Sequence, residues 1–86
     1  MIVIKVIFFA SFKEQLDCAQ LELSLDEGAN VQDLCSVLSS KGGRWQSLFG
    51  QANKNVKVAC NQCMADMSTL LDEGDEVAFF PPVTGG

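Results

Sequence analysis

Apolar residues recur along the chain in a pattern that predicts four or five short strands and one main helix. Residues 1–9 are apolar at every position except Lys5. Such a run is typical of a strand in the middle of a sheet that is at least partly covered on both faces. In residues 18–25 the apolar side chains instead alternate with polar ones, at Leu21, Leu23 and Leu25. This alternation predicts a half-buried antiparallel strand.

The main helix is predicted to begin after Asn30, because an Asn side chain at that position can accept a hydrogen bond from the first turn. Apolar residues three, four and seven positions apart then form one stripe, made of Val31, Leu34, Cys35 and Leu38. We expect this helix to end near Lys41, with Gly42 as the glycine that commonly follows a helix.

A short helix is predicted to end near Asp17, because Ser11 and Glu14 have the spacing of a capping box with Ser11 as the N-cap. Residues 43–54 are expected to be irregular, with one helical turn at 45–49. The aromatic residues of that turn, Trp45 and Phe49, are expected to lie in the core or as a lid over it.

The remaining strands are predicted at residues 55–60, 64–66 and 76–80, with turns at 61–62 and 72–75. One long helix between two sets of strands can cover one face of a mixed sheet of four or five strands. The pattern therefore predicts an α+β domain of two layers. A β-grasp arrangement, in which the first and last strands are adjacent and parallel in the middle of the sheet, fits the apolar run at 1–9.

Composition limits the function further. The chain has 86 residues, of which 48% are hydrophobic, and this is enough for one small domain. Its net charge of −5 makes nucleic acid an unfavourable partner, and the absence of histidine excludes imidazole chemistry. No apolar stretch approaches the ~20 residues of a membrane span. We expect a cytoplasmic protein with reduced cysteines.

The last eight residues form the most unusual segment, in which Phe79 and Phe80 end a strand and a tail of two prolines, Val83, Thr84 and two glycines follows. The two aromatic side chains should point to opposite faces of the strand, one into the core and the other to a possible interface beside the tail. An alternative places both in a covered sheet. Prolines stiffen the start of the tail, and glycines leave its tip without side chains; the tail residues are Pro81, Pro82, Val83, Thr84, Gly85 and Gly86.

Extended, these six residues reach about 20 Å, so their terminal carboxylate can enter a narrow channel in a partner. We therefore divide the chain into a domain at residues 1–80 and a tail at 81–86.

At this point the sequence resembles a known family, the MoaD-type small subunits of molybdopterin synthase. The resemblance covers the whole chain and depends on three segments, Ile4-Lys5-Val6-Ile7-Phe8-Phe9-Ala10, Ala59-Cys60-Asn61-Gln62 and Gly74-Asp75-Glu76-Val77-Ala78-Phe79-Phe80-Pro81-Pro82-Val83-Thr84-Gly85-Gly86. It implies a ubiquitin-like β-grasp fold and a sulfur carrier.

In this family the terminal glycine, here Gly86, is adenylated by an activating enzyme that uses ATP and is then converted to a thiocarboxylate. The resemblance implies that Gly86 donates this sulfur to a cyclic pyranopterin, forming the dithiolene of molybdopterin. It also implies a large subunit that receives the tail and supplies the catalytic groups, in a heterotetramer of two small and two large subunits. A sulfur donor protein is a further implied partner, and no cofactor is bound permanently.

Two other interpretations remain open. The same tail chemistry suits a carrier for thiamine or tRNA thiolation, or a modifier that is conjugated to lysine through Gly86. Separately, Cys60 and Cys63 form a C-x-x-C motif, which is a redox pair or, with Cys18 and Cys35, a zinc site. A second C-x-x-C is missing, so we expect no metal and treat the four thiols as small apolar side chains.

Overall fold

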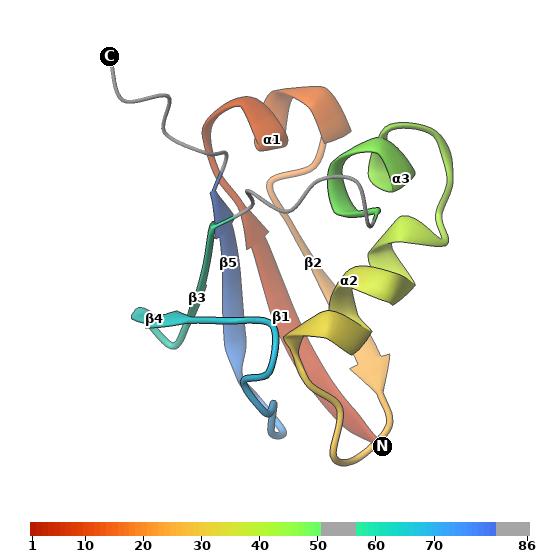
Figure 1. Ribbon diagram of the computed structural model, residues 1–86. Coiled ribbons are helices and arrows are strands. Elements are labelled where there is room, and N and C mark those ends of the chain that lie inside the picture. Colours follow the sequence, from red (N-terminus) through yellow and green to blue (C-terminus); the bar gives the residue numbers. More distant parts are fainter. Residues whose placement is uncertain (51–56, 81–86) are drawn as a thin grey trace.

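The protein consists of a five-stranded sheet and three helices in the computed structural model, which describes residues 1–50 and 57–80 (Figure 1). Across the sheet the strands follow the order β2 (Gln20–Leu25), β1 (Ile2–Phe8), β5 (Glu76–Phe80), β3 (Lys57–Cys60) and β4 (Cys63–Ala65). The helices are α1 (Ala10–Leu16), α2 (Val31–Ser39) and α3 (Gly43–Phe49).

The first and last strands lie side by side in the middle of the sheet. β1 pairs in parallel with β5, with Val6 opposite Val77, and in antiparallel with β2, with Val6 opposite Leu21. β5 pairs in antiparallel with β3 on its other edge. The mixed sheet and the central β1–β5 pair confirm the predicted β-grasp arrangement.

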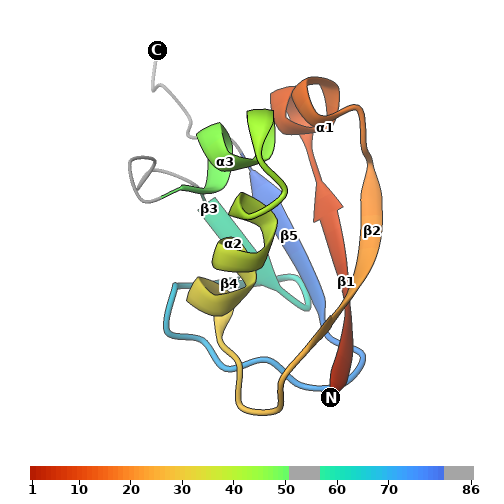
Figure 2. The ribbon, with the colours of Figure 1, turned by 90° about the vertical axis from the view of Figure 1, so that its right-hand side faces the viewer.

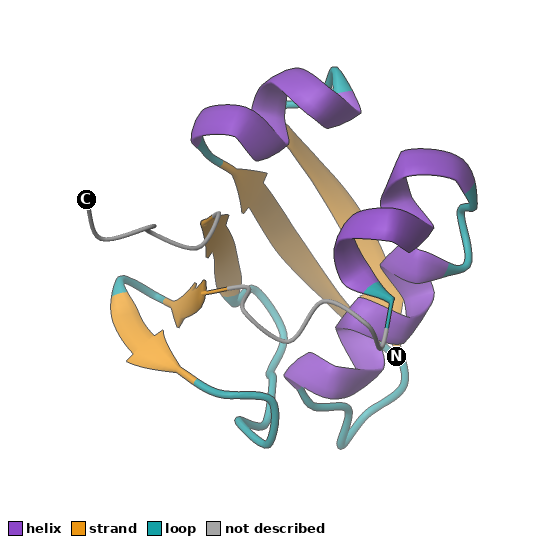
Figure 3. Ribbon diagram, turned by 45° about the horizontal axis from the view of Figure 1, so that its top comes forward, coloured by secondary structure: helices purple, strands orange, loops and turns teal. Residues whose placement is uncertain are grey.

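Helices cover only one face of this sheet. Helices α2 and α3 lie over that face, and α1 closes it at the end of β1 (Figures 2 and 3). Ile4, Val6 and Phe8 of β1 are accordingly buried beneath the helices. On the other face of the same strand, Val3 is 39% exposed and Ile7 is half-buried. The sequence predicted at least partial cover on both faces. Among the described residues all three helices pack on one side, while on the other face Lys5 and Ile7 are half-buried and Val3 is exposed.

The main helix begins as predicted. The Asn30 side chain accepts a hydrogen bond from the Asp33 amide at 2.9 Å, and the Asp33 carboxylate accepts one from the Asn30 amide at 3.0 Å. These reciprocal bonds satisfy two amides that have no partner within the helix.

In the described ranges, 1–50 and 57–80, no helix has the length and apolar character needed to span a bilayer.

The main helix ends earlier than predicted, at Ser39, and the next helix is longer than one turn. Gly42 has φ +78° and forms the N-cap of α3, so it opens the second helix and does not directly follow the first. Because L residues rarely adopt this φ, glycine permits the sharp change of direction between the two helices. The predicted irregular segment therefore contains two turns of helix; residues 51–56 lie outside the described part.

The first helix also differs from the prediction, because it begins at Ala10 and not after Ser11. The Phe9 amide donates to the Phe79 carbonyl at 3.2 Å, and the Phe12 amide donates to the Phe9 carbonyl, also at 3.2 Å. Strand pairing thus holds Phe9 where its own carbonyl starts the helix. Ser11 lies inside the helix, and no side chain caps this end.

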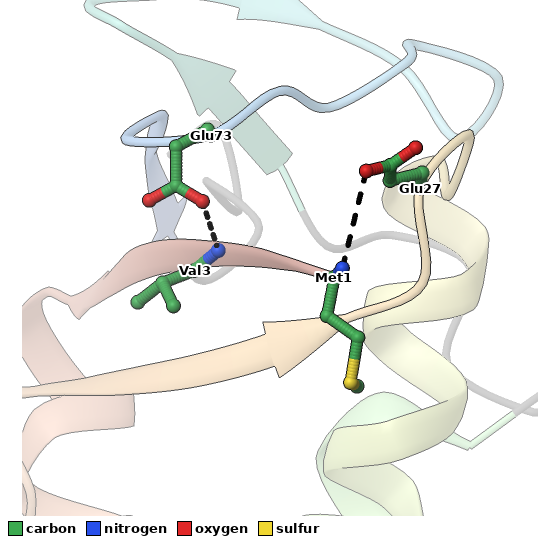
Figure 4. Close-up of polar contacts among 4 residues, drawn as sticks. All are labelled: Met1, Val3, Glu27 and Glu73. Atoms are coloured by element: carbon green, nitrogen blue, oxygen red, sulfur yellow. Dashed lines mark hydrogen bonds and ion pairs between the residues drawn. The ribbon is translucent and has the colours of Figure 1, made fainter.

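The turn at residues 72–75 fastens the start of β5 to β1. Glu73 accepts a hydrogen bond from the Val3 amide at 3.0 Å (Figure 4). The Gly74 amide donates to the Val3 carbonyl at 2.8 Å. Nearby, the amino group of Met1 lies 3.9 Å from the Glu27 carboxylate. The two bonds to Val3 help to fix the register of the central strand pair at the end far from the tail.

Candidate functional site

The candidate site is the end of β5, from which the tail continues. Phe79 and Phe80 end this strand and point to opposite faces of the sheet, as the sequence predicts. Phe79 is fully buried, with its ring centroid 5.0 Å from that of Phe49 and 6.2 Å from that of Phe8. Of the two possible interface residues, therefore, only Phe80 has surface to offer a partner.

Phe80 lies against Phe9 on the face of the sheet that the three described helices do not cover, which we call the open face. The two rings are parallel to within 4°, with their centroids 4.9 Å apart. Phe80 is half-buried, and Phe9 is 42% exposed. This pair brings together residues from the two ends of the sequence, directly before the first tail residue.

The open face is apolar at this end and charged at the other. Ile7 lies beside Ala78 in the β1–β5 ladder, and together with Phe9 and Phe80 they form what we call the tail-end patch. Lys57, opposite Phe80 on β3, is an exposed cation at its edge. Towards the start of β5 the same face instead carries Lys5, with Glu22 and Glu76 as its cross-strand neighbours.

The tail itself lies outside the described residues. This applies to the expected sulfur-accepting residue Gly86 and to the residues expected to present it, Pro81, Pro82, Val83, Thr84 and Gly85. The division into a domain at residues 1–80 and a tail at 81–86 likewise stays a prediction, because the described residues stop at Phe80.

Sequence reasoning missed Phe9 and Ile7 as parts of the site. The available signal was the alternation in residues 1–9, which puts Ile7 and Phe9 on the face opposite to Val6 and Phe8. Once β1 and β5 are paired in parallel, that face of β1 must lie beside Phe80. Phe9 and Phe80 are neighbours because of the register between β1 and β5, and no sequence motif predicts that register.

The acidic turn before β5 has a structural role. Asp75 accepts hydrogen bonds from the Asn61 side chain at 2.9 Å and from the Asp72 amide at 2.7 Å. These bonds, the Asn61 contact above all, hold the pKa of the Asp75 carboxyl below its usual range. The Asn61 side-chain oxygen in turn accepts from the Glu76 amide at 3.0 Å. Asp75 thereby ties the β3–β4 turn to the start of β5.

The cysteines are not gathered into a metal site. Cys35 lies on the buried side of α2, and burial raises the pKa of its thiol to about 11, so the thiol remains protonated. Within residues 1–50 and 57–80, which include all four cysteines, no three potential ligands of the His, Cys, Asp or Glu type lie close enough to hold a metal ion. The four-cysteine alternative is therefore not supported.

The two aromatic residues of α3 are packing residues, as expected. Phe49 is buried, and Trp45 is partly buried with its ring centroid 5.4 Å from that of Phe8 in an edge-to-face arrangement. The Lys41 ammonium lies 5.4 Å from the Trp45 ring centroid and covers part of its outer face. These contacts stabilise α3 against the sheet.

Comparison with known proteins identifies relatives along nearly the whole chain. The model of the ThiS family matches residues 6–86. The molybdopterin synthase sulfur carrier subunit of Haemophilus influenzae is 36% identical, over 96% of this chain and 99% of that protein. Small archaeal modifier protein 3 of Haloferax volcanii is 34% identical, over 92% of this chain and 94% of that protein.

Solved structures agree with this relationship. The solution structure of the Haloferax volcanii protein HVO 2177 matches with a TM-score of 0.84 and 28% identity, over 99% of this chain and 87% of that one. A ubiquitin of Caldiarchaeum subterraneum shares the fold at 13% identity, with a TM-score of 0.64 over 99% of this chain and 98% of that one. The fold is therefore the ubiquitin-like β-grasp that the sequence resemblance implied. Because the family model spans nearly the whole chain and relatives of similar length exceed 30% identity, this chain belongs to the ThiS family.

Proposed function

We propose that this chain is the sulfur carrier subunit of a molybdopterin synthase. The observation that supports this most strongly is its 36% identity, over nearly full length, to proteins that bear this name, together with its own terminal Gly85-Gly86. The chain is not an enzyme by itself in this proposal. Gly86 is the group that is modified, and a larger subunit supplies the catalytic groups.

The chemistry at Gly86 requires activation, because a carboxylate is a poor electrophile. An activating enzyme transfers AMP from ATP to the Gly86 carboxylate and releases pyrophosphate. A sulfur nucleophile, delivered by a sulfur donor protein, then displaces AMP and leaves a thiocarboxylate. Thiocarboxylate sulfur is polarizable and nucleophilic, so it can attack an activated carbon of a cyclic pyranopterin inside a pocket that excludes water.

The tail-end patch is the part of the described structure that fits this role. An apolar surface beside a flexible or extended peptide can dock on a partner while the peptide enters a pocket, and aromatic residues are the usual anchors of such interfaces. We propose that Phe9 and Phe80 contact the large subunit of the synthase. Two such small subunits would complete a heterotetramer with two large ones, in the cytoplasm, and no cofactor would be bound permanently.

Intact-mass spectrometry of the chain, incubated with ATP, a molybdopterin synthase activating enzyme and a sulfur donor, tests the proposal. We expect a mass gain equal to sulfur replacing one oxygen, located at Gly86 by fragmentation. A matched variant with one alanine added after Gly86 should keep the fold and lose the product. Absence of the sulfur species from the unmodified chain would refute the carrier function.

A second candidate is a protein modifier joined to lysine through Gly86. It is favoured by the 34% identity to a small archaeal modifier protein, because an acyl-adenylate at the same glycine can react with an amine in place of sulfur. No Lys or Arg follows Lys57, so trypsin would leave the whole segment 58–86 of this chain as the remnant on a modified lysine. Tryptic peptides that carry this remnant on lysine, in cells expressing this chain, would support the second candidate. Synthase activity restored by this chain in a strain lacking its own carrier, without such remnants, supports the first candidate alone.

A further inference from the structure

A second chemical feature lies at the β3–β4 turn, at the end of β5 that is far from the tail. Cys60 ends β3 and Cys63 begins β4, and the two are directly opposite each other in the antiparallel ladder. Asn61 and Gln62 form the two-residue turn between them, with φ of +52° and +70°. Positive φ at both positions is typical of a type I′ turn, which holds the two strand ends close together.

This placement meets the geometric requirements of a disulfide. Residues directly opposite in an antiparallel pair have Cα atoms about 4.5–5.5 Å apart, and their side chains lie on the same face of the hairpin. Disulfides form over Cα separations of about 4.4–6.8 Å. The pairing of Cys60 opposite Cys63 therefore places their Cα atoms within the range that a disulfide spans.

The two thiols differ in their surroundings. Cys63 is exposed, and Cys60 is half-buried with its sulfur 3.8 Å from an oxygen of the Asp75 carboxylate. Burial first, and then the charge and hydrogen bond of Asp75 and the nearby Cys63, raise the pKa of the Cys60 thiol. Cys63 is thus the thiol that a reagent in solution can reach, and Cys60 is a protonated neighbour with a carboxylate acceptor beside it.

We propose that Cys60 and Cys63 form a reversible disulfide across the β3–β4 turn, which is a redox site separate from the sulfur chemistry at Gly86. The oxidant is a low-molecular-weight disulfide. The Cys63 thiolate attacks one of its sulfur atoms, forms a mixed disulfide and releases one small thiol. Cys60 then loses its proton to solvent and attacks the Cys63 sulfur, which displaces the second small thiol.

The step is balanced. The two cysteines lose two electrons and two protons, and the small disulfide is reduced to two thiols. Sulfur-containing cargo at Gly86 takes no part in it, so the proposal goes beyond the carrier function and stands or fails independently.

The test uses the full-length chain and oxidised glutathione, followed by alkylation of free thiols under denaturing conditions and mass spectrometry. Of the four thiols we expect two to escape alkylation, with a loss of two hydrogens on the tryptic peptide that contains both Cys60 and Cys63. Dithiothreitol should restore all four. Alkylation of all four thiols after oxidation, or a stable glutathione adduct on Cys63, would overturn the proposal.

Matched variants separate the pair from the other thiols. Cys60→Ser should retain glutathione on Cys63 as a mixed disulfide, because no second thiol can displace it. Cys63→Ser changes an exposed residue and should lose the reaction while keeping the thermal transition of the unmodified chain. Cys18→Ser should still lose two alkylatable thiols; a linkage of Cys60 or Cys63 to Cys18, or to another copy of the chain, contradicts the proposal.

Discussion

The two faces of the sheet are built from the same strands but have different roles. On the covered face, Phe79 and Phe8 are buried among the helices and contribute to folding. On the open face, Phe80 and Phe9 stack on each other and remain partly accessible. Adjacent residues such as Phe79 and Phe80 thus have different roles, one in folding and the other at the surface. Substitutions on one face should leave the properties of the other face largely unaffected.

The largest effect is expected from Phe79→Ala. Truncating a fully buried phenylalanine removes apolar contacts and leaves a cavity, which costs about 3–5 kcal/mol of unfolding free energy. Such a loss is a large part of the stability of a small domain. Urea unfolding measures it, with Phe80→Ala as the matched control. Similar losses for the two variants would contradict the division between the faces.

Phe80→Ala should act on binding instead. We expect a loss of about 1–2 kcal/mol in the affinity for a synthase large subunit, roughly tenfold in Kd, because the aromatic anchor and its stacking partner are lost. Calorimetric titration measures the affinity.

Phe9→Ala should have a comparable effect, and the double variant should lose less than the sum, because the two rings act as one contact. An unchanged Kd for both single variants would show that the partner contacts another surface.

Both faces depend on the register of β5, because a shift of that strand by one residue would move its covered side chains to the open face. Asp75→Asn weakens the contacts that hold the start of β5 in place. An amide offers one acceptor where the carboxylate offers two, so we expect a loss on the order of 1 kcal/mol of unfolding free energy at pH 7. Urea unfolding at pH 7 measures this loss. Glu73→Gln, in the same turn, retains an acceptor for the Val3 amide and should have a smaller effect.

The Asp75 carboxyl should make the unfolding free energy depend on pH in the acid range. Because its pKa is lowered on folding, the stabilisation is complete above the unfolded pKa of about 3.9 and is lost as pH falls below that value towards the folded one. Asp75→Asn should therefore unfold with a weaker pH dependence between about pH 5 and 2. Identical acid profiles for the two proteins would contradict the assigned role of Asp75.

The smallest effect is expected from Val3→Thr. Val3 lies on the open face, away from the tail-end patch, and is 39% exposed. Threonine keeps the branched shape that suits a strand. Unfolding free energy should change by less than about 0.5 kcal/mol, and large-subunit affinity should not change. A loss of affinity comparable to that of Phe80→Ala would extend the interface over the whole face.

The sequence was sufficient to predict most of the fold, because the apolar periods of its strands and main helix match their burial. Asn30 and the alternation of Leu21, Leu23 and Leu25 are local signals that the structure confirms, although the strand predicted at 18–25 begins only at Gln20. The start of α1 could not be predicted in this way. Its position depends on the bond from the Phe9 amide to the Phe79 carbonyl, which joins distant parts of the chain.

The candidate site was predictable only in part, for the same reason. Phe80 was identifiable from its place at the end of a strand, but its partner Phe9 becomes visible only when the parallel pairing of β1 and β5 is known. The opposition of Cys60 and Cys63 likewise depends on an Asn-Gln turn, which lacks the glycine that usually marks this type of hairpin.

The central position of β5 has a consequence for synthesis of the protein. A hydrogen bond between Val3 and Glu73 spans 70 positions, and the strand that follows Glu73 completes the middle of the sheet. A nascent chain therefore cannot close its core until the segment next to the tail has left the ribosome. Chains that terminate before β5 should remain unfolded and be degraded, so that truncated copies do not accumulate and compete for partners.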